Sequence, residues 1–184
     1  YVMSSYNIIN GCRASECKEL LTDILRGEWG FEGPVISDYA AVDETITHGI
    51  AADSAEAARK CLEAGTDIEM MSSHYLVNGE ALVEAGKLDI ALIDEAVRRV
   101  LELKNALGLF ENPYKDADEA WEAELQNHPD HQRAAYEIAV ECPVLLKNDG
   151  VLPLKNLKSE GTLKIGVAGP FAGTDRVMGS WAVN

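Results

Sequence analysis

The sequence predicts an α/β protein built on a parallel sheet, and three observations support this. Apolar runs typical of buried strands lie at residues 1–6, 34–38 and 66–71. A helical pattern occupies the gap between each pair of runs. Strands that alternate with helices favour a parallel sheet, and the active sites of such folds gather at the carboxyl ends of the strands.

The first strand–helix–strand unit is expected within residues 2–38. We predict a short strand at 2–6 and a loop at 7–14 that contains the dipeptide Asn10-Gly11. Ser15 is placed to cap a helix that ends near Gly27. A glycine-rich turn then leads into the second strand.

The second unit has clearer helix signals. Asp53 followed by Glu56 three residues later fits a capping box, and Gly65 is suited to end the same helix. The third strand, at 66–71, follows directly. Further helices are expected at 76–85, 91–107 and 129–142, listed here in chain order.

The last third of the chain differs in composition. Residues 111–127 are acidic and poor in apolar side chains, which predicts a linker or a surface excursion. Asn148-Asp149-Gly150 is a turn signal between two short apolar runs. The apolar run at 163–170 predicts a buried strand that opens a second α/β domain.

The overall charge limits the classes of partner. A formal charge of −15, from 16 basic and 31 acidic residues, argues against nucleic acid and against anionic membranes as partners. No apolar run approaches the roughly 20 residues of a membrane span. The four cysteines and four histidines show no metal-ligand spacing, so we expect free thiols, no metal and no cofactor. The cysteine pattern does not decide between a cytoplasmic location and a secreted or periplasmic one.

The candidate site centres on Asp38, at the carboxyl end of the second predicted strand. Ser37 and Tyr39 flank it, so that a carboxylate lies beside an aromatic ring that can face a sugar. A carboxylate in this position is suited to attack an anomeric carbon. The alternatives are a strand-end Asp that caps a turn, a core aromatic at Tyr6 and a packing role for Tyr39.

Several motifs occur together in one order along the chain. They are Val2-Met3-Ser4-Ser5-Tyr6-Asn7-x-x-Asn10-Gly11, Leu20-Leu21-Thr22-x4-Gly27-Glu28-Trp29-Gly30-Phe31-x-Gly33, Ser37-Asp38, Ala64-Gly65-x-Asp67, Ala96-Val97-Arg98-Arg99-Val100-Leu101, Leu109-Phe110-x-Asn112-Pro113-Tyr114, Leu145-Leu146-Lys147-Asn148-x-Gly150-Val151-Leu152-Pro153-Leu154 and Gly179-Ser180-Trp181. With them the chain resembles glycoside hydrolase family 3, in its β-glucosidase and β-xylosidase branch, over nearly its whole length.

This resemblance implies an architecture. Residues 1–108 would be the C-terminal strand–helix units of a (β/α)8 TIM-like barrel. Residues 109–128 would link the domains, and residues 129–184 would begin an α/β sandwich domain. The chain starts inside an apolar run and stops after a glycine-rich turn, so we expect a segment of something longer.

The resemblance also implies roles for three residues. The family nucleophile falls on Asp38, and the family tyrosine that approaches it falls on Tyr6. Tyr39 occupies a position where many members have Trp, and it is expected to bind substrate with a smaller ring. The family's acid/base Glu and its sugar-gripping residues are expected outside this chain.

Two functional hypotheses follow. The first is a segment of a retaining β-glycosidase that acts on β-linked oligosaccharides or aryl and alkyl β-glycosides and releases terminal glucosyl residues through a glycosyl-Asp38 intermediate. A β-xyloside and a β-N-acetylglucosaminide are the alternative substrates. The second is a catalytically incomplete fragment that forms a homo-oligomer or needs a complementing barrel segment, because a three-stranded parallel sheet has two open edges.

Overall fold

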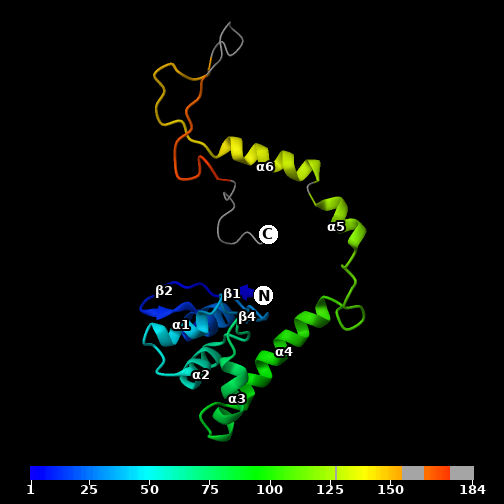
Figure 1. Cartoon of the computed structure of the whole chain (residues 1–184). Coiled ribbons are helices and arrows are strands. Elements are labelled where there is room, and N and C mark those ends of the chain that lie inside the picture. Colours follow the sequence, from blue (N-terminus) through cyan, green and yellow to red (C-terminus); the bar gives the residue numbers. More distant parts are fainter. Residues whose placement is uncertain (127, 155–163, 175–184) are drawn as a thin grey trace. The chain divides into compact units, whose positions relative to one another are not determined.

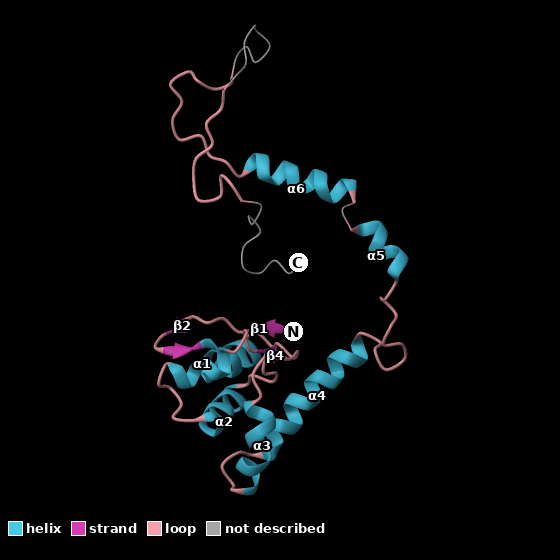
Figure 2. Cartoon of the chain, viewed as in Figure 1, coloured by secondary structure: helices cyan, strands magenta, loops and turns pink. Residues whose placement is uncertain are grey.

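The computed structural model describes residues 1–126, 128–154 and 164–174, and its contacts divide the chain into two units (Figure 1). The first unit, Tyr1–Ala117, is mixed α/β, and the second, Asp118–Asn184, contains two helices and coil in its described part. Figure 2 shows that helices outweigh strands throughout the described chain.

The first unit contains a parallel sheet, as predicted. Strand β1 (Val2–Met3) pairs with β4 (Val35–Ile36), with Val2 opposite Val35. On the other side of β4, Ile36 forms a parallel bridge with Ile68. The segment around Ile68 therefore lies next to β4, and β4 is central. The strands are shorter than predicted, and the expected third strand is reduced to this bridge.

The predicted loop at 7–14 holds a β-hairpin instead. Strand β2 (Ile8–Ile9) pairs antiparallel with β3 (Cys12–Arg13). Asn10 and Gly11 form the turn with φ angles of 51° and 83°. A two-residue turn whose φ angles are both positive suits the twist of a hairpin, and Asn-Gly is the dipeptide that adopts it most readily.

The helix predicted from Ser15 to Gly27 is divided. A 3₁₀ turn, η1 (Ala14–Glu16), precedes η2 (Glu19–Glu28), which has the i→i+5 hydrogen bonds of a π-helix. Ser15 does not cap it, because its buried hydroxyl lies 2.8 Å from the Ser4 hydroxyl in a hydrogen bond between the two side chains.

The later helices lie close to their predicted positions. Helix α2 (Ser54–Ala64) begins at Asp53, whose carboxylate accepts a 2.9 Å hydrogen bond from the Glu56 N–H, and it ends at Gly65 with φ 101°. Helices α3 (His74–Glu84) and α4 (Ile90–Ala106) start within two residues of the predicted positions. Helix α1 (Ala41–Thr47) was not predicted.

The core of the first unit forms around α2. Its buried residues Ala58 and Leu62 pack with Leu82 of α3 and with Leu88, and its Cys61 packs with Val42 of α1. The last residue of α2, Ala64, joins Leu21 of η2 and Val35 of β4 in a third cluster. This packing holds η2 and α2 against the short sheet.

A buried carboxylate ties the sheet to two helices. The side chain of Asp67 is 2% exposed and accepts hydrogen bonds at 2.7 Å from Arg26 of η2, from Arg99 of α4 and from the Val35 N–H. Because a buried charge is tolerated only when it is paired, this network fixes the start of β4 relative to η2 and α4.

The second unit differs from its prediction at two places. Helix α6 (Pro129–Glu141) was predicted, but α5 (Glu119–Leu125) lies inside the expected linker and is capped by Asp118. The expected strand at 163–170 is wrong in its described part, where 164–170 is exposed coil. No strand lies beside it among the described residues of this unit, so its backbone has no ladder to join. Residue 163 and the Gly179-Ser180-Trp181 motif lie outside the described residues.

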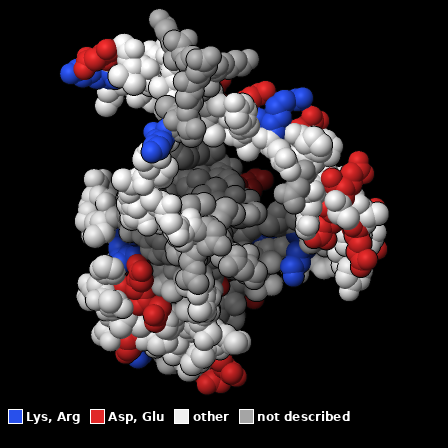
Figure 3. Space-filling model, turned by 45° about the horizontal axis from the view of Figure 1, so that its top comes forward, with Lys and Arg blue, Asp and Glu red and all other residues white. Residues whose placement is uncertain are grey.

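Acidic side chains outnumber basic ones on the face shown in Figure 3, in keeping with the formal charge of −15. Among the described residues, no helix combines the length and the apolar character that crossing a bilayer requires.

Candidate active site

The carboxyl ends of the parallel segments bring the candidate residues together. Tyr6 follows β1, and Asp38 follows β4, its direct neighbour. The chain around Glu69 to Met71 follows the bridge at Ile68 on the other side of β4. Asp38 therefore lies at the end of the central strand, with backbone from both neighbours beside its loop.

Asp38 is partly buried and is held by its own loop. Its Oδ1 accepts a 2.7 Å hydrogen bond from the Tyr39 N–H, and its carbonyl oxygen accepts one of 3.0 Å from the N–H of Ala41, the first residue of α1. The carboxylate therefore lies at the carboxyl end of β4 and also caps the turn that follows, as the alternative interpretation of Asp38 expected.

Tyr6 approaches Asp38 from the side of β1. Its hydroxyl donates a 2.6 Å hydrogen bond to the carbonyl oxygen of Tyr39. Partial desolvation, followed by the charge of the Asp38 carboxylate and a hydrogen bond to it, raises the pKa of the Tyr6 phenol above its ordinary value. The phenol thus remains a proton donor beside the carboxylate. Tyr6 is 42% exposed, which is inconsistent with a core aromatic.

Tyr39 and Ala40 complete the loop after Asp38. The Tyr39 side chain is 44% exposed, as expected for a ring available to a ligand. Ala40 has φ 53° and ψ 18°, a left-handed conformation that is unfavourable for a residue with a Cβ. Strained backbone of this kind is concentrated at functional sites. The sequence gives no signal for it, because Ala is an ordinary residue in right-handed structure.

The other acids near the loop are engaged elsewhere. Glu44 of α1 forms a 2.6 Å ion pair with the buried Arg13 of β3, and Asp43 lies 3.2 Å from Nε2 of His74. Glu69 accepts hydrogen bonds from the Ser72 hydroxyl and from two N–H groups at the start of α3. It therefore stabilises the beginning of that helix.

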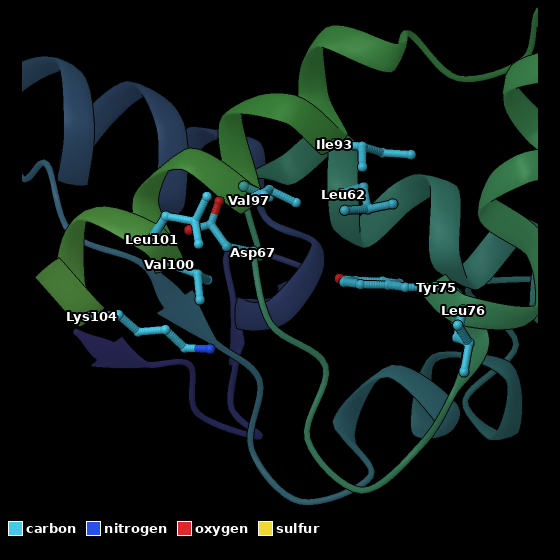
Figure 4. A pocket seen from close by; sticks show the side chains of 10 residues that line it. Leu62, Asp67, Tyr75, Leu76, Ile93, Val97, Val100, Leu101 and Lys104 are labelled. Atoms are coloured by element: carbon cyan, nitrogen blue, oxygen red, sulfur yellow. The ribbon is translucent and has the colours of Figure 1, made fainter. Parts of the chain in front are cut away.

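A separate hollow of about 460 Å³ lies between α2, α3 and α4. Figure 4 shows Leu62 and Tyr75 on one side of it and Val97, Val100 and Leu101 of α4 on the other. Its lining is mostly apolar and includes no residue of the loop around Asp38. Its character differs from that of a site that must hold a hydroxyl-rich sugar.

The described residues contain no group of three or more His, Cys, Asp or Glu side chains that could hold a metal ion. The four cysteines are free, and burial raises the pKa of Cys61 to about 12. A thiol with so high a pKa is a poor nucleophile at neutral pH.

Comparison with known proteins shows the family of this chain. Residues 1–103 match the model of the glycosyl hydrolase family 3 N terminal domain. The chain is 40% identical to a periplasmic β-glucosidase of Salmonella typhimurium, over 98% of this chain and 24% of that protein. It is 37% identical to a putative β-xylosidase of Formosa agariphila, over 95% of this chain and 23% of that protein.

A solved structure is similar as well. The β-glucosidase from Listeria innocua in complex with glucose superposes with a TM-score of 0.73 at 44% identity, over 83% of this chain and 21% of that one. This chain thus spans about a quarter or less of the length of each of these proteins.

Proposed function

This chain belongs to glycosyl hydrolase family 3, and on that premise we propose that it is the segment of a retaining β-glycosidase that carries the nucleophile, Asp38. The observation that supports this role most directly is the position of Asp38. It follows the central strand of a parallel sheet, with the hydroxyl of Tyr6 beside its loop, after the neighbouring strand, and an exposed ring next in sequence. Parallel α/β folds carry their catalytic groups at this edge.

The proposed reaction has two steps. A carboxylate oxygen of Asp38 attacks the anomeric carbon and forms a glycosyl ester, while the bond from that carbon to the leaving oxygen breaks and the leaving oxygen takes a proton from a general acid. Water then attacks the same carbon, the ester bond breaks and the Asp38 carboxylate is restored. The proton from water returns to the group that served as acid.

The general acid is proposed to lie outside this chain. Asp43 and Glu44 are the acids nearest to Asp38 in sequence, and their ion-pair contacts with His74 and Arg13 suit a structural role. A retaining enzyme needs its two carboxyl groups about 5–5.5 Å apart. The isolated chain would accordingly be incomplete for catalysis.

The family's N-terminal domain has a TIM-barrel type of fold, and the first unit of this chain is a mixed α/β part of it. We place the last strand–helix units of the barrel at 1–108, the linker at 109–128 and the start of a sandwich domain at 129–184. The family match over 1–103 supports the first of these assignments.

The proposed substrate is a glycoside with a terminal β-D-glucosyl residue. The relatives named as β-glucosidases and the glucose complex of the Listeria enzyme support this choice. A β-xyloside is the second candidate, supported by the relative named as a putative β-xylosidase. In this proposal Tyr39 is the ring that faces the sugar or its leaving group.

Trapping with a fluorinated β-glucosyl fluoride tests the proposal in the full-length protein. We expect one sugar per protein, attached to the peptide that contains Asp38, and no trapping in the Asp38→Asn variant. The control variant Asp43→Asn, which removes an exposed carboxylate five residues further on, should be trapped normally. A label on any other side chain would overturn the assignment.

The isolated chain provides a second test. We expect no hydrolysis of a nitrophenyl β-glucoside by residues 1–184 alone. We also expect a mass in solution above that of a monomer, because a second copy would cover the open side of the segment at Ile68. Turnover by the isolated chain that is lost in Asp38→Asn would show that the acid is present within it.

A further inference from the structure

We infer that Ser37 is a positioning residue for Asp38, an inference that rests on the proposed function of that carboxylate. The Ser37 side chain is fully buried and precedes Asp38 in the chain. It therefore acts on the reaction only through the loop that carries the nucleophile, and its effect follows from its hydrogen bonds.

The Ser37 hydroxyl joins the nucleophile loop to the neighbouring segment. Its oxygen accepts a 2.8 Å hydrogen bond from the Met70 N–H and donates one of 2.9 Å to the carbonyl oxygen of Asp38. The Ser37 N–H still forms a sheet-like bond of 2.8 Å to the Ile68 carbonyl. The hydroxyl thus adds one more hydrogen bond between the two neighbouring segments, just beyond the last backbone bond of the sheet.

Met70 is held from two sides by the same loop. Its N–H binds Ser37, and its carbonyl oxygen accepts a 3.1 Å hydrogen bond from the Ala40 N–H. The backbone of Met70 is therefore bound at both its N–H and its carbonyl by residues of the loop at 37–40. The bond from the Ala40 N–H to Met70 helps to hold Ala40 in its left-handed conformation, which is unfavourable for a residue with a Cβ.

The opposite flank of the loop is fixed by Tyr6, whose hydroxyl binds the Tyr39 carbonyl. The loop of Asp38 is thus fixed on both sides, by the Tyr6 hydroxyl on the side of β1 and by the bond between Ser37 and Met70 on the side of Ile68. Removal of the Ser37 hydroxyl leaves the Met70 N–H without this acceptor and takes one of two hydrogen bonds from the Asp38 carbonyl. A shift of about 1 Å in a catalytic group can cost about 100-fold in rate.

The Ser37→Ala variant of the full-length protein tests this inference, because it keeps the shape of the side chain. We expect kcat to fall by about 10- to 100-fold with KM nearly unchanged, since no contact with the sugar is removed. The rate of trapping by the fluorinated sugar should fall by the same factor, while the final label remains on Asp38.

Thr66→Val is the matched control. Thr66 is equally buried, lies at the other end of the same segment and donates a 2.7 Å hydrogen bond to the Ser15 carbonyl. It should lose comparable thermal stability with kcat within about twofold of the wild type. If Ser37→Ala does not fold, Ser37→Cys, whose hydrogen bonds are weaker, must show the same fall in kcat at constant KM.

The outcomes separate the two proposals. A wild-type label on a residue other than Asp38 defeats the proposed function. A label on Asp38 together with a wild-type trapping rate in Ser37→Ala defeats only the positioning role. An equal loss of kcat in Thr66→Val would also defeat it, because general destabilisation would then explain both variants.

Discussion

The Tyr6 hydroxyl donates a 2.6 Å hydrogen bond to the carbonyl oxygen of Tyr39, which joins the chain after β1 to the loop after β4. The two residues are 33 positions apart in sequence and come together because β1 and β4 are parallel neighbours. One tyrosine hydroxyl therefore contacts the backbone next to Asp38 and also carries a pKa that responds to the Asp38 charge.

Tyr6→Phe is expected to lower kcat by about 10-fold, because the variant loses the hydrogen bond that fixes the loop beside Asp38. The Tyr6 pKa is raised above 10.0, so the phenol stays neutral across the usual assay range. The loss should therefore be the same factor from about pH 5 to about pH 9, measured as the ratio of kcat in the two proteins. A ratio that shrinks towards the alkaline end would mean that Tyr6 ionises there.

Tyr39→Ala separates the ring of this residue from its backbone. The carbonyl that binds Tyr6 is retained, so the loop should keep its anchor while the exposed ring is lost. We expect KM for an aryl β-glucoside to rise by about 5- to 10-fold, the value of roughly 1 kcal/mol of ring contact. Tyr39→Phe, which keeps the ring, should stay near the wild type. An unchanged KM in Tyr39→Ala would assign the ring to packing.

Capping residues predicted where a helix begins and ends when the cap lies within a few residues of the helix. The Asp53 carboxylate binds the Glu56 N–H, and Gly65 has a φ of 101°, so both ends of α2 were readable from single positions. The parallel order of β1, β4 and the segment at Ile68 followed from strand–helix alternation alone.

The remaining elements depend on contacts that the sequence does not display. Helix α1 starts after Ala40, which has no capping side chain and is held by the Met70 carbonyl. Ser15 was expected to cap a helix but binds Ser4 across the structure. The hairpin at Asn10-Gly11 did have a local signal, and the prediction of a simple loop gave it too little weight.

The candidate site was predicted in part. Asp38, Tyr6 and Tyr39 were expected at one edge of the sheet, and the structure places them there. Their catalytic roles remain proposals. The hydrogen bond from the Met70 N–H to the Ser37 hydroxyl could not be predicted, because it depends on the register between Ile36 and Ile68.

Asp67→Asn is expected to destabilise the first unit by about 3–5 kcal/mol, because it leaves Arg26 and Arg99 without their buried partner. Arg98→Gln removes contacts to Glu95 and Glu102, but Arg98 is 50% exposed, so solvent screening should make its cost much smaller than that of Asp67→Asn. Urea unfolding of both variants measures the difference. Similar costs for the two would show that burial does not set the strength of these pairs.

Gly65→Ala is expected to cost more stability than Gly86→Ala. Both positions have positive φ, 101° and 66°, so each variant loses about 1 kcal/mol from backbone strain. At Gly65 the new Cβ would also lie 3.1 Å from the Thr22 hydroxyl, which itself donates to the Ala64 carbonyl, whereas nothing lies within 4 Å at Gly86. The shift in melting temperature compares them, and equal shifts would mean that Thr22 moves aside freely.

Glu95→Gln is expected to flatten the loss of stability in acid. Hydrogen bonds from Arg98, with the charges of Arg99 and Arg98, lower the pKa of Glu95 from 4.5 to about 2. Because the folded-state pKa is the lower one, the carboxylate stabilises the fold above pH 4.5, and this contribution is lost as pH falls from there to about 2. Urea midpoints measured across this window should fall less steeply in Glu95→Gln than in the wild type. Glu84→Gln, which removes an exposed carboxylate that has no ion pair among the described residues, should keep the wild-type slope. If the two variants gave the same slope, the acid sensitivity would come from general charge and not from the arginine pair on α4.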